Sequence, residues 1–216
     1  MIVVIDLSGF QHPRLARVYV QASAAADLRG GREHRKRLLD GLEGRVIEIG
    51  AGNGRNFAHY PKTVSEVVAV EPEDTLRRFA EAEAASAPVP VRVVAGHAEA
   101  LPGEAQAFDA AVVSLVLCSV PSPPAALAEI ARVLRPGGEL RFYEHVRSSN
   151  PVLGLLQDAI TPVWRRMAGR CSPNRDTLAA IRRAGFAVDE VERFAFAPQP
   201  PIPALAHVLG RAHRTT

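Results

Sequence analysis

The run VIEIGAGNGRNFAHYP, residues 46–61, holds residue types that suit the binding of a small ligand. An acid, Glu48, stands among apolar residues. Three glycines follow it at alternate positions: Gly50, Gly52 and Gly54. A glycine turn after a buried strand lets the backbone approach a ligand closely, as in dinucleotide-binding folds. The dinucleotide pattern needs a small residue at position 55, where this chain has Arg55. The spacing therefore favours a ligand other than a dinucleotide.

A second acid, Glu71, ends the apolar segment EVVAVEP, 21 positions after Gly50. A carboxylate at the end of a strand can accept hydrogen bonds from both hydroxyls of a ribose. Several adenosine cofactors share this contact, so Glu71 predicts an adenosine ligand without choosing among them.

The spacing E-x-G-x-G-x-G resembles motif I of the class I S-adenosylmethionine-dependent methyltransferases. The resemblance implies that the cofactor is S-adenosylmethionine and that the turn passes its methionine end. The predicted cofactor-binding residues lie in four loops that follow strands: Glu48, Gly50, Ala51, Gly52, Asn53, Gly54, Asn56, Glu71, Pro72, His97, Ala98, Glu99, Ser114 and Leu115.

Further segments, NFAHYP, LVLCSV, RVLRPGG and EHV, resemble the type 11 methyltransferase domain, in the branch that contains the alkyl-thiol S-methyltransferases. The resemblance implies a small, lipophilic acceptor, with a thiol sulfur as the first choice. The residues predicted to line the acceptor pocket are Tyr60, Leu117, Cys118, Trp164 and Cys171. His145 is the candidate catalytic base, with Glu144 as its partner, although a partly ionised thiol needs no strong base.

Several alternatives remain open at this point. N- or O-methylation of a phospholipid headgroup or small metabolite is the nearest one, and a non-catalytic cofactor-binding protein is another. A nicotinamide-dependent reductase is disfavoured by Arg55 and by the lack of a clear Tyr-x-x-x-Lys pair. The fourth loop, residues 114–120, is apolar where base-methylating enzymes carry a polar motif, so no nucleic-acid partner is expected.

The elements that must position these residues alternate between strands and helices. We expect strands at 45–50, 66–72, 89–96, 139–146, 185–196 and 205–214, and a further strand with its exit loop at 108–120. Helices are expected at 11–43, 74–87 and 122–134, where RPGG (135–138) ends the helix, and from Asn150 onward. The alternation predicts an α/β, Rossmann-like, mostly parallel sheet with helices on both faces, and the resemblance implies seven strands.

The chain of 216 residues is expected to form one methyltransferase domain, 1–216. Within it we expect an N-terminal helical cap (1–43), a cofactor-binding core (44–148), and C-terminal helices with a final strand pair (149–216). Cys118 and Cys171 are isolated in the sequence, so neither a disulfide framework nor a metal site is expected.

We expect a cytoplasmic protein. The net charge is +3, no apolar run is long enough for a membrane span, and MIVVIDLSGF does not have the pattern of a secretory leader. The basic cluster RGGREHRKR (29–37) predicts a solvated helix face. Its alternatives are an acidic partner or, at most, peripheral membrane contact. The pattern leaves the oligomeric state open.

Overall fold

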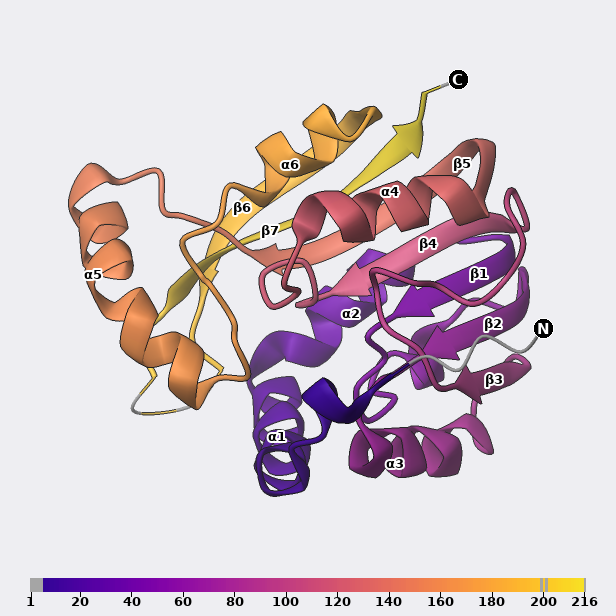
Figure 1. Ribbon diagram of the computed structural model, residues 1–216, viewed down its shortest axis with the longest axis horizontal. Coiled ribbons are helices and arrows are strands. Elements are labelled where there is room, and N and C mark those ends of the chain that lie inside the picture. Colours follow the sequence, from indigo (N-terminus) through magenta and orange to yellow (C-terminus); the bar gives the residue numbers. More distant parts are fainter. Residues whose placement is uncertain (1–5, 199, 201, 216) are drawn as a thin grey trace.

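The computed structural model describes residues 6–198, 200 and 202–215. Its centre is a seven-stranded sheet with strand order β3-β2-β1-β4-β5-β7-β6, and helices cover both faces (Figure 1). The predicted α/β, Rossmann-like fold is therefore confirmed. Residues 1–5 of the opening segment, and residues 199 and 201 of the proline-rich loop after 196, lie outside the described residues.

The strands are β1 (Gly44–Ile49), β2 (Val64–Val70), β3 (Val91–Val94), β4 (Phe108–Ser114), β5 (Leu134–His145), β6 (Phe186–Phe196) and β7 (Leu205–Arg214). The helices are α1 (Pro13–Ala26), α2 (Arg32–Leu39), α3 (Asp74–Ala84), α4 (Pro123–Val133), α5 (Pro151–Met167) and α6 (Thr177–Arg183), with short turns η1 (Ser8–Phe10), η2 (Asp27–Gly31) and η3 (Phe57–His59). Strands β1 to β5 pair in parallel, whereas β7 runs antiparallel to both β5 and β6.

Alternation along the strands divides the core into two layers. In β1, Ile47 and Ile49 join the cluster that contains the buried side chains of α4 and α6. Val46 points the other way and packs with the leucines of α2. Successive side chains of a strand face opposite sides of the sheet, so Glu48 lies on the same side as Val46. Glu48 therefore faces the side of the sheet that α2 covers.

The helix predicted over 11–43 is broken in its middle. Gly30 has φ of 120°, a value that a helix cannot contain, and the five-residue π turn η2 surrounds it. The kink separates α1 from α2, which packs on the sheet beside β5 and β7 (Figure 1). Because only glycine adopts this φ readily, Gly30 sets the direction of α1.

The sequence predicted that RPGG (135–138) separates a helix from the next strand. In the structure this segment lies within β5. Helix α4 ends at Val133, and β5 already begins at Leu134, which pairs with Phe108 of β4. The pairing register shifts between Phe108 and Ala110, and Gly137 has φ of 72°. A glycine in a left-handed conformation allows such an irregularity, so β5 continues through the segment.

The C-terminal pair of strands is confirmed. Strand β7 covers the predicted 205–214, and β6 differs from the predicted 185–196 by one residue. The long helix predicted from Asn150 is also confirmed as α5, whose first turn is capped by the Asn150 side chain.

Candidate functional site

The predicted site residues gather at the carboxyl ends of the parallel strands. Strands β1 and β4 are neighbours in the sheet, although two other strands separate them in sequence. The chain leaves β1 toward β2 on one side, and β4 continues toward β5 on the other. Open α/β sheets bind their ligands at such a change of direction. The loops after β1, β2, β3 and β4 are thus the walls of one candidate site.

The glycine turn follows β1 and has the backbone that its sequence predicts. Gly50, Gly52 and Gly54 have φ of 66°, 58° and 78°, in the left-handed region. The N–H groups of Gly50 and Ala51 donate to the carbonyl of Val70 at 2.8 and 3.0 Å, which ties the turn to the end of β2. A side chain at these positions would be strained and would meet Val116, Tyr19 or Phe57, so the tight packing of this turn requires glycine.

Glu71 follows β2 and touches the glycine turn. Its carboxylate accepts hydrogen bonds from the backbone N–H of Gly52 at 2.7 Å and of Glu73 at 2.9 Å. Burial raises the pKa of Glu71 to about 7, against the lowering effect of these two bonds. Pro72 comes next, and its carbonyl accepts from the Gln11 side chain at 2.9 Å.

Glu48 lies beneath the turn and holds it from below. Its carboxylate accepts from Asn56 Nδ2 at 2.8 Å and from the Tyr60 hydroxyl at 2.7 Å. Burial raises the pKa of Glu48 to about 7, against these two bonds. Tyr60 was predicted to line the acceptor pocket, but its side chain is buried against Glu48 and the α2 layer. The position of Tyr60 is a correction: the short turn η3 ends at His59 and places the Tyr60 hydroxyl on Glu48, where it supports the glycine turn.

An ionic network joins η2 to the same turn, and sequence reasoning missed it. Asp27 is buried and accepts from Arg35 Nε at 3.1 Å and from Arg55 Nε at 2.7 Å. Arg35 also donates to Asn56 Oδ1 at 3.0 Å. The expectation of a solvated face for cluster 29–37 is therefore wrong for Arg35, although Lys36 is exposed. Arg55, which breaks the dinucleotide pattern, is an anchor for the N-terminal helices.

The N-terminal segment covers two more parts of the site. Tyr19 of α1 lies over Gly52, where an added Cβ would approach its ring at 3.2 Å. Ser23 donates to the side chain of Asn53 at 3.3 Å. Phe10 stacks on His97 of the third loop with 5.3 Å between ring centroids.

In the loop after β3, the side chains of His97 and Glu99 contact different parts of the protein. Ala98 is buried, and His97 is partly exposed against Phe10. Glu99 was predicted to meet an adenine edge, but its carboxylate accepts from the backbone N–H of Ser122 at 2.6 Å. Since Ser122 caps α4, Glu99 is directed to the start of that helix and away from the predicted role.

The loop after β4 is fixed by Glu144. The Glu144 carboxylate, fully buried, accepts from the backbone N–H groups of Val116, Leu117 and Cys118 at 2.8, 2.9 and 3.0 Å. Among the described residues it makes no hydrogen bond to His145, so the predicted catalytic pair is not formed. Leu115 has φ of 62° and Ser114 lies at the end of β4. A strained non-glycine residue is typical of a functional site.

Three side chains that the sequence treated separately converge beyond this loop. Cys118 Sγ lies 3.6 Å from Cys171 Sγ. His145 Nδ1 lies 3.4 Å from Cys171 Sγ and 3.6 Å from Cys118 Sγ. Both cysteines are buried, and His145 is partly exposed. The two cysteines are isolated in the sequence, 53 positions apart, and the fold brings them together beside His145.

The surroundings of this sulfur cluster favour a negatively charged sulfur. The hydrogen bond with Cys118, and then the one with His145, lower the pKa of Cys171. The same bond between the two cysteines, together with burial, raises the pKa of Cys118. Arg175 donates to the carbonyls of Leu117 and Val120 at 2.6 and 2.8 Å, which fixes a cation at the same loop. The Trp164 side chain also lowers the pKa of Cys171, although its buried indole N–H makes no hydrogen bond of standard geometry within the described part of the chain.

Helix α5 stands away from the sheet, at the far left of Figure 1, and it leads into the Cys171 loop. It exposes a group of apolar side chains: Val152, Leu153, Leu155, Leu156, Val163 and Met167. Among the described residues, none of the helices combines the length and apolar character that a membrane crossing requires.

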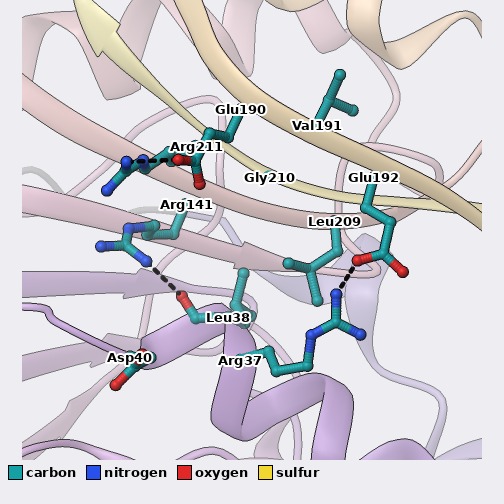
Figure 2. A pocket seen from close by; sticks show the side chains of 10 residues that line it. All are labelled: Arg37, Leu38, Asp40, Arg141, Glu190, Val191, Glu192, Leu209, Gly210 and Arg211. Atoms are coloured by element: carbon teal, nitrogen blue, oxygen red, sulfur yellow. Dashed lines mark hydrogen bonds and ion pairs between the residues drawn. The ribbon is translucent and has the colours of Figure 1, made fainter.

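A separate pocket of about 600 Å³ lies between α2 and the strands β5, β7 and β6 (Figure 2). Its charged groups pair with one another, Arg37 with Glu192 and Arg211 with Glu190. Arg141 donates to the carbonyl of Leu38 at 3.4 Å. None of the predicted site residues lines this pocket, so it is not the candidate site.

Comparisons with known proteins agree with this geometry. The family model for the methyltransferase domain matches residues 47–142. The thiol S-methyltransferase TMT1B of Homo sapiens is 34% identical over 190 residues, which cover 81% of this chain and 73% of that protein. The ubiquinone/menaquinone biosynthesis C-methyltransferase UbiE of Syntrophotalea carbinolica is 31% identical over 156 residues, 70% of this chain and 62% of that protein.

Among solved structures, a SAM-dependent methyltransferase of Thermotoga maritima, described as a possible histamine N-methyltransferase, has the same fold. The TM-score is 0.71 at 24% identity, with 94% of this chain and 98% of that chain covered.

Proposed function

This chain belongs to the S-adenosylmethionine-dependent methyltransferases, in the branch of the thiol S-methyltransferase TMT1B, and we propose from this premise that its methyl acceptor is a small lipophilic thiol. The cofactor is S-adenosylmethionine, and the chain is an enzyme of methyl transfer. Bound S-adenosylmethionine supplies a methyl group activated on a sulfonium sulfur.

The glycine turn and Glu71 fit this cofactor. A Cβ on Gly50 would stand 2.7 Å from Val116 Cγ2, and one on Gly52 would meet the Tyr19 ring. The turn therefore packs closely between the β4 loop and α1 only while these positions carry no side chains. We assign Gly50 and Gly52 to the methionine end and Glu71 to the ribose hydroxyls, because Glu71 is the acid nearest the turn at the end of β2.

The choice of acceptor rests on one observation: the backbone N–H groups of the loop after β4 already donate hydrogen bonds within the protein. The N–H groups of residues 116, 117 and 118 donate to Glu144, and that of Leu115 donates to the carbonyl of Tyr143 at 2.7 Å. The carbonyl of Cys118 accepts from Ser172 at 2.7 Å. The loop thus has little left with which to bind an amine or an alcohol, and it presents apolar side chains instead. An apolar surface suits a thiol, which loses little when its hydrogen bonds to water are removed.

The protein needs to do little chemistry on such an acceptor. A cysteine-like thiol has a pKa of about 8.5, so a few per cent of it is ionised at neutral pH, and a less acidic alkanethiol is ionised to a smaller extent. The cation of Arg175 lies at the same loop and would favour the ionised form of an acceptor thiol that binds there. The chain then contributes mainly alignment of the two reactants and exclusion of water, which together account for a large share of such rate enhancements.

The exposed apolar side chains of α5 support a lipophilic acceptor. Val163 is 60% exposed and Met167 is 70% exposed, and the helix ends at Met167, four positions before Cys171. An alkyl chain extending from the site would cover part of this apolar surface, and each buried methylene would contribute about 0.8 kcal/mol.

The test is a comparison of three acceptors with one carbon skeleton: an alkanethiol, the alkanol and the alkylamine. Purified protein with radiolabelled S-adenosylmethionine should methylate the thiol at a rate at least about a hundredfold above the other two. Omission of protein measures the spontaneous reaction. Methylation of the alcohol, the amine or a phospholipid headgroup without turnover of any thiol would overturn the proposal and favour N- or O-methylation.

A further inference from the structure

We propose that Cys118, His145 and Cys171 bind one zinc ion, with its fourth coordination position open to the sulfur of the acceptor. The three residues come from the β4 loop, the end of β5 and the segment after α5. They are the group of side chains in the described part of the chain whose donor atoms all lie within 4.8 Å of one another. The role of the open position rests on the proposed thiol acceptor, whereas the zinc site itself does not.

The distances match tetrahedral coordination. Zinc lies about 2.3 Å from cysteine sulfur and about 2.0 Å from histidine nitrogen. A tetrahedral angle then separates two sulfurs by about 3.8 Å and a sulfur from a nitrogen by about 3.5 Å. The observed separations are 3.6 Å between the sulfurs and 3.6 and 3.4 Å from His145 Nδ1 to the two sulfurs. All three edges agree with the expected values to within about 0.2 Å, the tolerance of real metal sites.

The backbone holds two of the ligands in place from outside. Cys118 donates its N–H to Glu144 at 3.0 Å and accepts at its carbonyl from Ser172 at 2.7 Å. Ser172 follows Cys171, so this one bond fixes the two cysteines relative to each other. Second-sphere contacts of this kind orient ligands and raise metal affinity.

The ligand set has the composition of a catalytic zinc site. Two thiolates and one imidazole are three protein ligands, and catalytic zinc keeps a fourth position for water or substrate. Thiolate ligands select zinc over hard cations such as magnesium. A thiol that enters the fourth position releases its proton to solvent and binds through one sulfur lone pair. Another lone pair of that sulfur would form the new bond to the methyl carbon while the methyl–sulfonium bond of S-adenosylmethionine breaks. The electrons of the broken bond leave with S-adenosylhomocysteine, so no oxidant or reductant is required.

Cobalt is the probe of the site, because it takes the place of zinc and is coloured. Reduced, metal-free full-length protein titrated with Co²⁺ should saturate at about one equivalent. It should show thiolate-to-metal charge transfer in the near ultraviolet and the intense visible bands of a tetrahedral site. Zn²⁺ should then displace Co²⁺. Absence of these bands in a protein whose two thiols react with a thiol reagent would overturn the zinc site and leave a hydrogen-bonded thiol cluster.

The variants separate ligation from folding. Cys171→Ser and Cys118→Ser should each weaken Co²⁺ binding at least about tenfold and reduce the charge-transfer intensity, with circular dichroism unchanged. His213→Ala removes an exposed histidine that lies outside the cluster, and it should bind as the parent does. Equal Co²⁺ binding by Cys171→Ser, Cys118→Ser and the parent would contradict the assignment.

A last comparison tests the fourth position separately from the proposed function. Without S-adenosylmethionine, an alkanethiol should shift the visible cobalt bands of the parent protein, and the alkanol of equal length should not. No shift with the thiol would overturn the role of the metal in acceptor binding. Undiminished thiol methylation by protein freed of metal with a chelator would also overturn that role, while the proposed function would stand. Cobalt binding without any thiol methylation would retain the site and reject the function.

Discussion

Glu71 is the single residue whose loss most narrowly tests the cofactor site, since its buried carboxylate touches the turn through Gly52. Hydrogen bonds to a charged group contribute about 1.5–3 kcal/mol. We expect Glu71→Ala to weaken binding of S-adenosylhomocysteine at least about tenfold, measured by calorimetry. Glu81→Ala removes an exposed acid of α3 and should bind normally. Unchanged affinity in a folded Glu71→Ala protein would reject the assignment of this carboxylate.

The raised pKa of Glu71, about 7, gives the same contact a pH dependence. The ionised form accepts both ribose hydroxyls, so the ligand binds best above the pKa, and protonation opposes binding below it. Affinity for S-adenosylhomocysteine should therefore fall by up to about tenfold per pH unit below 7. Glu48 has a pKa of about 7 as well, so Glu71→Gln is the control. That variant should lose most of the slope, and a slope equal to that of the parent would show that Glu71 is not its source.

At the scale of elements, the sequence predicted the features that depend mainly on residues close together in the chain. The glycine turn, the Ser122 and Asn150 caps and strand β7 depend on neighbouring residues, so their positions followed from the sequence. The cluster of Cys118, His145 and Cys171 could not be predicted, because its three residues come from segments that meet only in the fold. Considered by itself, Cys118 has the properties of a small apolar residue. The sequence placed Glu99, Glu144 and Tyr60 in the right segments, but the direction of a side chain depends on partners that are distant in sequence.

The segment between α5 and Cys171 stores backbone strain that a substitution can release. Arg170 has φ of 70°, a conformation that favours glycine, and its side chain is exposed. Such a residue costs about 1–3 kcal/mol, partly offset in a glycine variant by about 0.5–1 kcal/mol of chain entropy. Arg170→Gly should be more stable to urea than Arg170→Ala by about 1 kcal/mol. Equal stability of the two variants would show that this backbone is not strained.

Helix α5 should affect long acceptors and spare short ones. Charges in place of Val163 and Met167 remove apolar surface from the last turns of α5, which lead into the Cys171 loop. Even one methylene left uncovered is worth about 0.8 kcal/mol, or about fourfold in affinity. We expect the double change to lysine to raise KM for a long alkanethiol at least about fourfold, with KM for ethanethiol unchanged as the internal control. Equal effects on both thiols would exclude an acceptor path along α5.

At the scale of the whole molecule, the N-terminal segment closes the site from outside. Gln11 binds the Pro72 carbonyl, Phe10 stacks on His97, and Tyr19 covers Gly52, so one segment touches the loops after β2, β3 and β1. Asp27 locks this cap to the turn through two arginines. The sheet positions the loops that we propose bind the cofactor, and the N-terminal segment covers them. The segment after α5 brings Cys171 to Cys118, in the proposed acceptor region.

The central claim is that the methyl group goes to sulfur. The measurement that tests it most directly is a single turnover with S-adenosylmethionine isotopically labelled in its methyl group. Protein in excess over cofactor receives an equimolar mixture of the alkanethiol, alkanol and alkylamine of one chain length, and nuclear magnetic resonance locates the labelled carbon. We predict that nearly all of the label appears in the methyl thioether. Label in the methyl ether or the methylamine, with none in the thioether, would contradict the account.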